Sequence, residues 1–276
     1  MKNFSNTYIF IFSAVMVILV AAILSFVAMK LKPVQELNIR VETMQNILKS
    51  VHIESTEKNA EELFQKYIVD SYVINMDGHK VAGPEALSVD LSKEVTKIDK
   101  IKKLESSLIE RRVSPFKKFL SGFIKSETIN IQDVKKDIWE VDGSRLLPVY
   151  VSYNNSDSLY IFPLRGKGLW GPIWGFISLK SDMNTVYGAV FDHKSETPGL
   201  GAEINQDWFQ KEFDGKKLFK DGKFQSIKVV KGGTSDADLY GVDAISGGTI
   251  TSRGVQAMLY DCLSSYDTFF ENKRNN

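Results

Sequence analysis

The sequence has one cysteine, three histidines and almost no net charge, and each scarcity excludes a class of site. Cys262 alone cannot form an intrachain disulfide, and its place on an apolar helical face predicts a small core residue. The three histidines are scattered without metal-ligand spacing, so we predict no metal site. A net charge of +1 gives no argument for a nucleic-acid partner, which needs a concentrated basic face.

Charged residues are missing from residues 8–29, an almost unbroken apolar run. Its length suits a helix that spans about 30 Å of hydrocarbon. A cleaved signal peptide is the alternative, but its apolar core is usually only about 7–15 residues long. We therefore predict an uncleaved single-pass transmembrane anchor over residues 1–32. Pro33 predicts a break, because proline cannot continue a helix without losing a hydrogen bond; the remaining domain is residues 33–276.

The first half of that domain has mainly helical spacing. We predict helices over residues 34–51 and 57–67, a strand over 68–74 that turns into a partner strand at 80–82, and helices around 98–108 and 116–123. The last two belong to residues 85–140, where Lys and Glu are interleaved with apolar residues. A membrane-surface helix is one interpretation. The mixture of both charge signs favours solvated helices with one face on the core.

From residue 142 onward the pattern changes to short β-branched and aromatic runs. These predict strands over residues 146–153, 158–164, 176–179, 186–193 and 226–230, with a short helix or turn near 202–208. The glycine-rich segment 165–175 between them is predicted to be irregular, and it has neither a Walker pattern nor the complete dinucleotide fingerprint. The fold class is therefore α+β, a mostly antiparallel sheet flanked by helices, preceded by the anchor.

The stretch 243–252 places hydroxyl-bearing residues on both sides of Gly247 and Gly248, and apolar residues at helical spacing follow over 255–270. The two glycines are therefore predicted to lie on a loop that opens a helix. Unpaired N–H groups at a helix start carry partial positive charge and can bind a phosphate. The plainer interpretation is a helix N-cap supplied by Thr251 or Ser252.

The same stretch resembles the flavinylation motif of the FMN-binding domain family, approximately Asp-x-x-Ser-Gly-Ala-Thr-x-Ser/Thr. Asp243, Ser246, Gly247 and Thr251 match it, whereas Gly248 stands where alanine is commoner. The resemblance implies that FMN is joined through its phosphate to the hydroxyl of Thr249 as a phosphoester. It implies no catalytic side chain.

A second stretch, residues 196–201, resembles the Glu-Thr-Pro-Gly-Leu-Gly signature of that family. The resemblance places Glu196, Thr197 and Leu200 beside the flavin. Without it, a Pro-Gly turn between a strand and a helix is the plainer interpretation. Trp170 and Trp174 lie in the glycine-rich segment 165–175 and either stack on the flavin or fill the core.

Within the family, the chain is similar to the C subunits of sodium-translocating NADH:quinone oxidoreductases. This implies an electron relay inside a respiratory complex, inactive alone, with other membrane subunits as partners and a flavin transferase during maturation. The alternatives are the G subunit of Rnf electron-transport complexes and a membrane-tethered binding module without redox function. The resemblance places the domain on the periplasmic side of the inner membrane, whereas Lys30, Lys32 and Arg40 behind the span favour the cytoplasm by the positive-inside rule.

Overall fold

The computed structural model describes residues 5–113, 131–154, 157–235 and 237–275. The chain divides into two compact units, Met1–Met44 and Gln45–Asn276. Most of the first unit is α1 (Asn6–Ser50), whose apolar part has a mean hydropathy of 2.9 and no buried residues in its best 18-residue window. By length and composition this helix can cross a membrane, which agrees with the predicted anchor. The predicted domain boundary at residue 32 stays a prediction.

The predicted break at Pro33 is wrong, because α1 continues through the proline without interruption. A proline inside a helix removes one backbone hydrogen bond and crowds the carbonyl four residues earlier. The apolar run before Pro33 and the helical spacing after it favour helix on both sides, so this local cost does not end the helix. The two helices predicted on either side of Pro33 are therefore one element.

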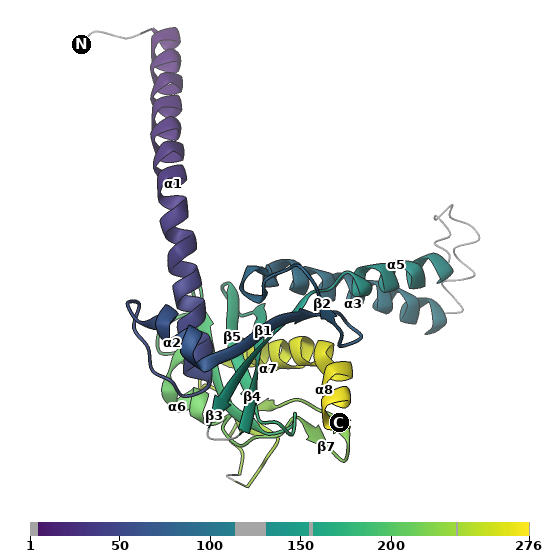
Figure 1. Ribbon diagram of the computed structural model, residues 1–276. Helices are drawn as coiled ribbons and strands as arrows, with labels where there is room; N and C mark the ends of the chain where they lie inside the picture. The colour runs from purple at the N-terminus through teal and green to yellow at the C-terminus, as the bar shows by residue number, and fades with distance from the viewer. Residues whose placement is uncertain (1–4, 114–130, 155–156, 236, 276) are drawn as a thin grey trace. The chain divides into compact units, whose positions relative to one another are not determined.

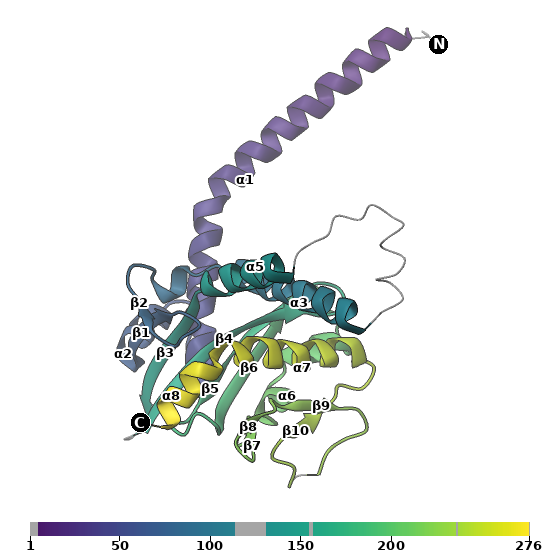
Figure 2. The ribbon, with the colours of Figure 1, turned by 90° about the vertical axis from the view of Figure 1, so that its right-hand side faces the viewer.

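The second unit is built on a six-stranded sheet in the order β2-β1-β3-β4-β5-β6, with every neighbouring pair antiparallel (Figure 1 and Figure 2). This confirms the predicted fold class. The strands are β1 (Ile68–Ile74), β2 (Lys80–Val81), β3 (Leu147–Asn154), β4 (Asp157–Lys167), β5 (Pro172–Leu179) and β6 (Val186–His193). Their β-branched and aromatic residues were the signal that located them.

One face of the sheet is covered by α7 (Thr249–Leu263) and α8 (Asp267–Arg274), which cross it in sequence (Figure 2). The turn η3 (Ser264–Tyr266) separates them. The prediction of one continuous helix over 255–270 is therefore wrong, because the segment forms two helices. The main core lies at this interface: the Phe162 ring centroid is 4.8 Å from that of Tyr266 and 5.1 Å from that of Phe270. Cys262 is buried here, as predicted.

The opposite face packs against α2 (Ala60–Tyr67) and the end of α1 that belongs to the second unit. Phe64 contacts Tyr150 edge-on, with ring centroids 6.3 Å apart. The Ser178 hydroxyl, buried in β5, donates to the carbonyl of Ser50 at 2.5 Å. The helix predicted over 57–67 is α2, which begins three residues later than predicted, at Ala60.

The predicted irregular segment 165–175 is mostly strand. β4 continues to Lys167 and β5 begins at Pro172, so only residues 168–171 form the turn, closed by a 2.8 Å bond from Gly168 N to the Gly171 carbonyl. Glycine occurs inside these strands because neighbours approach closely: a Cβ on Gly166 would lie 2.7 Å from Cβ of Met258, and one on Gly175 would meet the Val190 carbonyl.

Two small sheets complete the unit. The predicted strand 226–230 is β9 (Lys228–Val230), which pairs in parallel with β10 (Gly241–Asp243). The pattern missed β10, and it missed the β7–β8 hairpin (Phe219–Lys220 and Lys223–Phe224), because strands of two or three residues are too short to give a period. The predicted helix or turn near 202–208 is η2 (Gly201–Asn205) followed by α6 (Asp207–Lys211).

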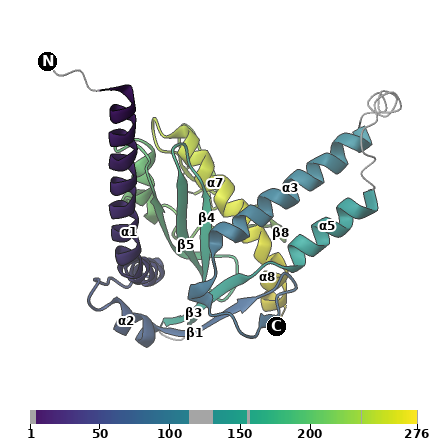
Figure 3. The ribbon, with the colours of Figure 1, turned by 90° about the horizontal axis from the view of Figure 1, so that it is seen from above.

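The segment 85–140 contains η1 (Ala86–Ser88) and α3 (Leu91–Val113), and α5 (Ile131–Gly143) begins in it. The helices α3 and α5 lie side by side (Figure 3). The predicted helix over 98–108 is confirmed within α3, whereas α5 was not predicted. Ile98, Ile101 and Leu104 are half-buried, as expected for a solvated helix with one face on the protein. The helix predicted at 116–123 lies outside the described residues.

Candidate functional site

The stretch 243–252 forms a turn that closes directly onto the start of α7. Gly248 N donates to the Ile245 carbonyl at 3.0 Å, and Gly247 adopts a φ of +74°, which glycine tolerates without strain. The hydroxyl of Ser252 accepts a 3.1 Å hydrogen bond from Ile245 N. The predicted loop that opens a helix is confirmed, and a side chain from within the helix holds it in place.

Helix α7 begins at Thr249, with Gly248 as its N-cap and no hydrogen bond from a capping side chain. The interpretation of Thr251 or Ser252 as an N-cap is therefore wrong, because both lie inside the first turn, where they are buried. Thr249 is the first helical residue and is half-buried. The backbone N–H groups of this first turn lack intrahelical partners and carry the positive end of the helix dipole.

The two predicted motifs meet at Glu196, which is only 4% exposed. Thr251 donates its hydroxyl proton to Oε2 of Glu196 at 2.5 Å, and the backbone N–H of Trp170 donates to Oε1 at 2.8 Å. One carboxylate thus joins the first turn of α7, the 196–201 loop and the β4–β5 turn. These segments are far apart in sequence, so no spacing could have predicted the bond from Thr251.

Burial of Glu196 by itself raises the pKa of the carboxyl group. The hydrogen bonds donated by the Thr251 hydroxyl and by the backbone N–H groups of Trp170, Leu169 and Gly171 more than offset burial, so the pKa lies below its usual value. Glu196 is therefore ionised at neutral pH, and its charge is satisfied by donors from the surrounding loops. It holds the site together as an acceptor.

Three glycines allow the close approach of these segments. A Cβ on Gly201 would collide with Oγ1 of Thr251, and one on Gly168 would lie 2.5 Å from Oε1 of Glu196. A Cβ on Gly247 would lie 2.5 Å from Cδ2 of Leu200. The contact between Gly247 and Leu200 brings the second motif against the start of α7. Gly168 and Gly201 are structural residues of the site whose individual roles the sequence did not reveal.

The predicted residues differ in accessibility. Ser246, Gly247, Thr197 and Leu200 are exposed beside the helix start, whereas Gly248, Thr251 and Glu196 are buried beneath it. The exposed part is unusually apolar, since Leu169, Trp170, Leu200 and Ile250 are 47%, 65%, 41% and 55% exposed. Trp170 therefore does not fill the core. Trp174 is half-buried on β5.

Asp243 faces another part of the fold. Its Oδ1 accepts hydrogen bonds from the backbone N–H of Thr234 at 2.6 Å and from the Thr234 hydroxyl at 2.9 Å. Its own N–H donates to Oε2 of Glu212 at 2.7 Å. Burial, and then the negative charge of Asp243, raise the pKa of Glu212. In this arrangement Asp243 stabilises the loop before β10, and its side chain is engaged away from Thr249.

His193 lies at the end of β6; from the sequence it was, with Lys194, either a group that stabilises an anionic reduced flavin or an exposed loop charge. Its Nδ1 accepts a 3.2 Å hydrogen bond from the backbone N–H of Glu196, and its own backbone N–H donates to Oδ1 of Asp192 at 2.7 Å. Its buried Nε2 has no hydrogen-bond partner among the described residues. The imidazole thus fixes the beginning of the 196–201 loop, a role that needs the folded geometry to be seen.

Comparison with known proteins places this site in a family. The sequence model of the FMN-binding domain matches residues 168–264, a range that contains both motifs completely. The C subunit of the Na(+)-translocating NADH-quinone reductase from Vibrio vulnificus is 30% identical over 246 residues, which cover 85% of this chain and 81% of that protein. The alignment with the corresponding protein from Vibrio campbellii is shorter, with 42% identity over 39% of this chain and 42% of that protein.

Two solved structures that resemble this chain are of the same subunit as these relatives. A crystal structure of the C subunit of the Na(+)-translocating NADH-quinone reductase from Parabacteroides distasonis has a TM-score of 0.66 and 36% identity, covering 87% of this chain and 96% of that one. A crystal structure of Shewanella oneidensis NqrC has a TM-score of 0.60 and 26% identity, covering 86% and 98%. Because both sequence and fold match over most of the length, the chain belongs to the NqrC family, the C subunits of Na(+)-translocating NADH-quinone reductases.

Proposed function

We propose that FMN is attached to this chain as a covalent phosphoester on the hydroxyl of Thr249 and passes electrons between other subunits of the complex. Membership of the family makes the chain an FMN-binding subunit of a sodium-translocating NADH-quinone reductase, and the enzyme activity belongs to that complex. The observation that carries the covalent linkage is the placement of Thr249, the first residue of a helix that has no side-chain cap.

The hydroxyl groups of the motif are not equally available. Thr251 donates to buried Glu196, and Ser252 accepts from Ile245 N, so both are already engaged inside the fold. Ser246 and Thr249 remain. A phosphate on Thr249 is next to the free N–H groups of the first turn of α7, where the helix dipole favours negative charge. This electrostatic advantage supports Thr249 over Ser246 as the acceptor.

The surroundings of Thr249 fit the rest of the cofactor. Leu200 lies against Gly247, and the backbone N–H of Trp170 donates a hydrogen bond to Glu196. The exposed apolar side chains of Leu200 and Trp170 are therefore held where a planar aromatic ring system can pack against them. Thr197, also exposed, can hydrogen-bond a polar ring edge. FMN supplies the redox chemistry when bound. The chain's own residues orient it: Glu196 fixes the loop, and Leu200 and Trp170 limit the access of water.

The proposed partners are the other membrane subunits, a flavin transferase that reads the 243–252 stretch during maturation, and membrane lipid around the apolar part of α1. We place the second unit on the periplasmic side, as the family resemblance implies. The basic residues behind the span do not exclude this, because large domains translocate largely regardless of nearby charge. Alkaline phosphatase fused to the C-terminus tests this side: it is active if the fusion is periplasmic, and inactivity would reverse the orientation.

Replacement of Thr249 tests the linkage. Protein produced beside a flavin transferase is denatured and separated by electrophoresis, and flavin fluorescence is read from the polypeptide band. Thr249→Ala is expected to remove the fluorescence, whereas the matched control Ser246→Ala is expected to keep it. Fluorescence that persists in Thr249→Ala and disappears in Ser246→Ala would move the acceptor to Ser246. A wild-type chain without flavin would favour the binding module without redox function.

A further inference from the structure

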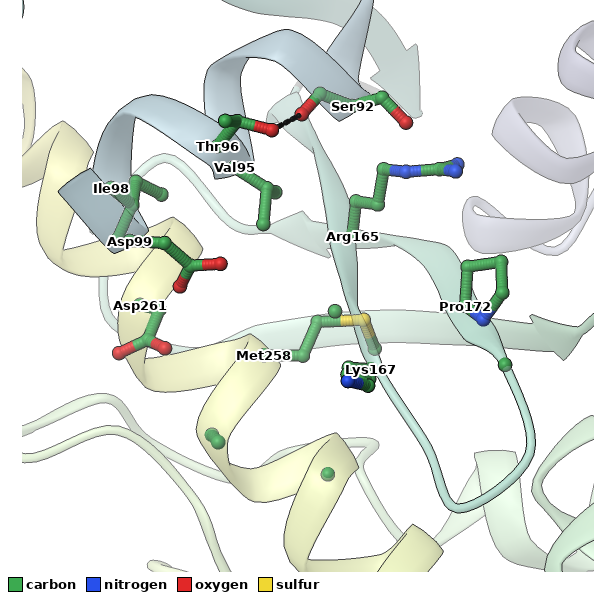
Figure 4. Close-up of a pocket in the computed structure, with 14 residues that line it drawn as sticks. Ser92, Val95, Thr96, Ile98, Asp99, Arg165, Lys167, Pro172, Met258 and Asp261 are labelled. Carbon is green, nitrogen blue, oxygen red and sulfur yellow. Dashed lines mark hydrogen bonds between the residues drawn. The ribbon is translucent and has the colours of Figure 1, made fainter.

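A pocket of about 410 Å³ lies between α3, the β4–β5 hairpin and α7 (Figure 4). Its volume is within the range of about 300–1,000 Å³ that small-molecule sites usually have. Neither Thr249 nor Glu196 lines it. Gly254 is on α7, whose first residue is Thr249, and a Cβ on Gly171 would lie 2.9 Å from Oγ of Ser195. The pocket therefore adjoins the proposed FMN site but is made of other residues.

Two cations line one wall of the pocket. Arg165 and Lys167 are two residues apart on β4, so their side chains leave the same face of the strand. The ion pairs recorded among the described residues include neither of them. Ser92, in the first turn of α3, lines the same side of the pocket in Figure 4. This wall offers two positive charges and a hydroxyl group to an anion.

In Figure 4 the two acidic residues of the pocket lie on the other side of it from Arg165 and Lys167. Asp261 of α7 is ion-paired with Lys102 of α3 at 2.5 Å, so its charge is compensated. Asp99 carries the remaining negative charge. The lining therefore has two cations on β4 and one carboxylate that is not paired among the described residues. This excess of positive charge favours an anionic ligand.

The remaining lining is largely apolar. Val95 and Ile98 of α3 and Met258 of α7 face the pocket. A smaller cavity of about 20 Å³ continues beneath α3; it shares Val95, Ile98 and Arg165 with the pocket and is lined further by Leu91. An anion held on β4 would therefore have apolar surface beside it, which a bare inorganic ion would leave unused.

We propose that this pocket binds a small amphipathic anion, a phosphate or carboxylate group that carries an apolar substituent. The anionic group binds Arg165 and Lys167, and the apolar substituent packs against Val95, Ile98 and Met258. Such a ligand is either a soluble metabolite or the headgroup region of an anionic lipid. The assignment is independent of the attachment of FMN to Thr249.

The test measures binding of 4-fluorophenyl phosphate by 19F NMR to the full-length chain in phosphatidylcholine nanodiscs. We expect saturable binding, with inorganic phosphate about tenfold weaker because it lacks the apolar group. Arg165→Gln and Lys167→Gln should each weaken binding about tenfold by removing a charge-assisted hydrogen bond. Asp99→Asn should tighten it, because a like charge is removed. Lys223→Gln on β8, outside the pocket, is the matched control and should bind like wild type.

Ala257→Leu gives a second test that keeps every charge, since it adds apolar volume to the pocket on a helix that accepts leucine well. It should weaken the binding of 4-fluorophenyl phosphate more than the binding of inorganic phosphate.

Nanodiscs that contain phosphatidylglycerol distinguish the two sources of the ligand. If phosphatidylglycerol weakens the binding of 4-fluorophenyl phosphate, the ligand is a lipid. If binding is equal in both kinds of nanodisc, the ligand is a soluble molecule. The proposal is overturned if no saturable binding occurs up to about 10 mM, ten times the dissociation constant of a millimolar site. Unchanged binding in Arg165→Gln and Lys167→Gln, or equal binding of inorganic phosphate, would also overturn it.

Discussion

Thr251→Val removes the hydroxyl group that joins the flavinylation motif to Glu196, with almost no change in side-chain shape. The hydroxyl is buried and lies 2.5 Å from a carboxylate that is 4% exposed. A hydrogen bond to a charged group contributes about 1.5–3 kcal/mol, and its loss leaves the carboxylate with one donor fewer. We expect a decrease of about 2 kcal/mol in the free energy of unfolding of the second unit. For a unit of this size that is a lower Tm by about 4–8 °C.

The pH dependence gives this prediction a second, independent readout. The pKa of Glu196 is lowered in the folded state, so its stabilisation is fully present above the unfolded pKa of about 4.3 and is lost as the pH falls through the folded pKa. Removal of the Thr251 donor raises the folded pKa toward the unfolded one. The variant should therefore lose less additional stability than wild type when the pH is lowered from neutral toward about 3.

Thermal unfolding followed by near-ultraviolet circular dichroism measures both quantities in the full chain. Thr96→Val is the matched control, because the exposed Thr96 hydroxyl donates only to the Ser92 carbonyl within α3. It should change stability by no more than about 0.5 kcal/mol. If Thr251→Val costs as little as this control, or has the same acid dependence as wild type, Glu196 does not hold the two motifs together as described.

Three other predictions test the site and the core. Gly247→Ala should destabilise the unit by about 1–2 kcal/mol, because φ is +74° and the new Cβ would displace Leu200; a changed flavin circular dichroism spectrum would reveal that displacement, and an unchanged stability would contradict it. Burial raises the pKa of Cys262 to about 11, so iodoacetamide at a pH of about 8 should label it only after denaturation; rapid labelling of the folded chain would show that it is accessible. Tyr266→Phe should cost about 1–2 kcal/mol in thermal unfolding, because the buried Pro148 carbonyl loses its 2.8 Å donor; no loss would mean that water replaces it.

The elements whose signals are local were predictable from the sequence. The strands Ile68–Ile74 and Val186–His193 were predicted with their observed bounds, because each is a run of β-branched and aromatic residues ended by polar ones. The errors have physical causes of two kinds. Pro33 and the 165–175 glycines are breakers by propensity, but helix continuity and close strand packing overrode that propensity. The strands β7, β8 and β10 are too short to carry a period.

The candidate site was predictable as two motifs but not as one structure. The start of α7 at the paired glycines follows from helical spacing, and the family resemblance singled out Thr249 and Leu200. The bond from Thr251 to Glu196 joins residues 55 positions apart, and the engagement of Asp243 by Thr234 depends on the parallel β9–β10 pair. Both depend on tertiary geometry, which no local pattern records.

The covalent attachment of FMN to Thr249 is tested most directly by a mass spectrum of the tryptic peptide 232–253 from chain matured in its own cells. This peptide contains Ser246, Thr249, Thr251 and Ser252 together, so fragmentation can locate a modification among them. We expect a single FMN, joined through its phosphate with loss of water, on Thr249. An unmodified peptide, or FMN located on any other residue of the peptide, would contradict the assignment.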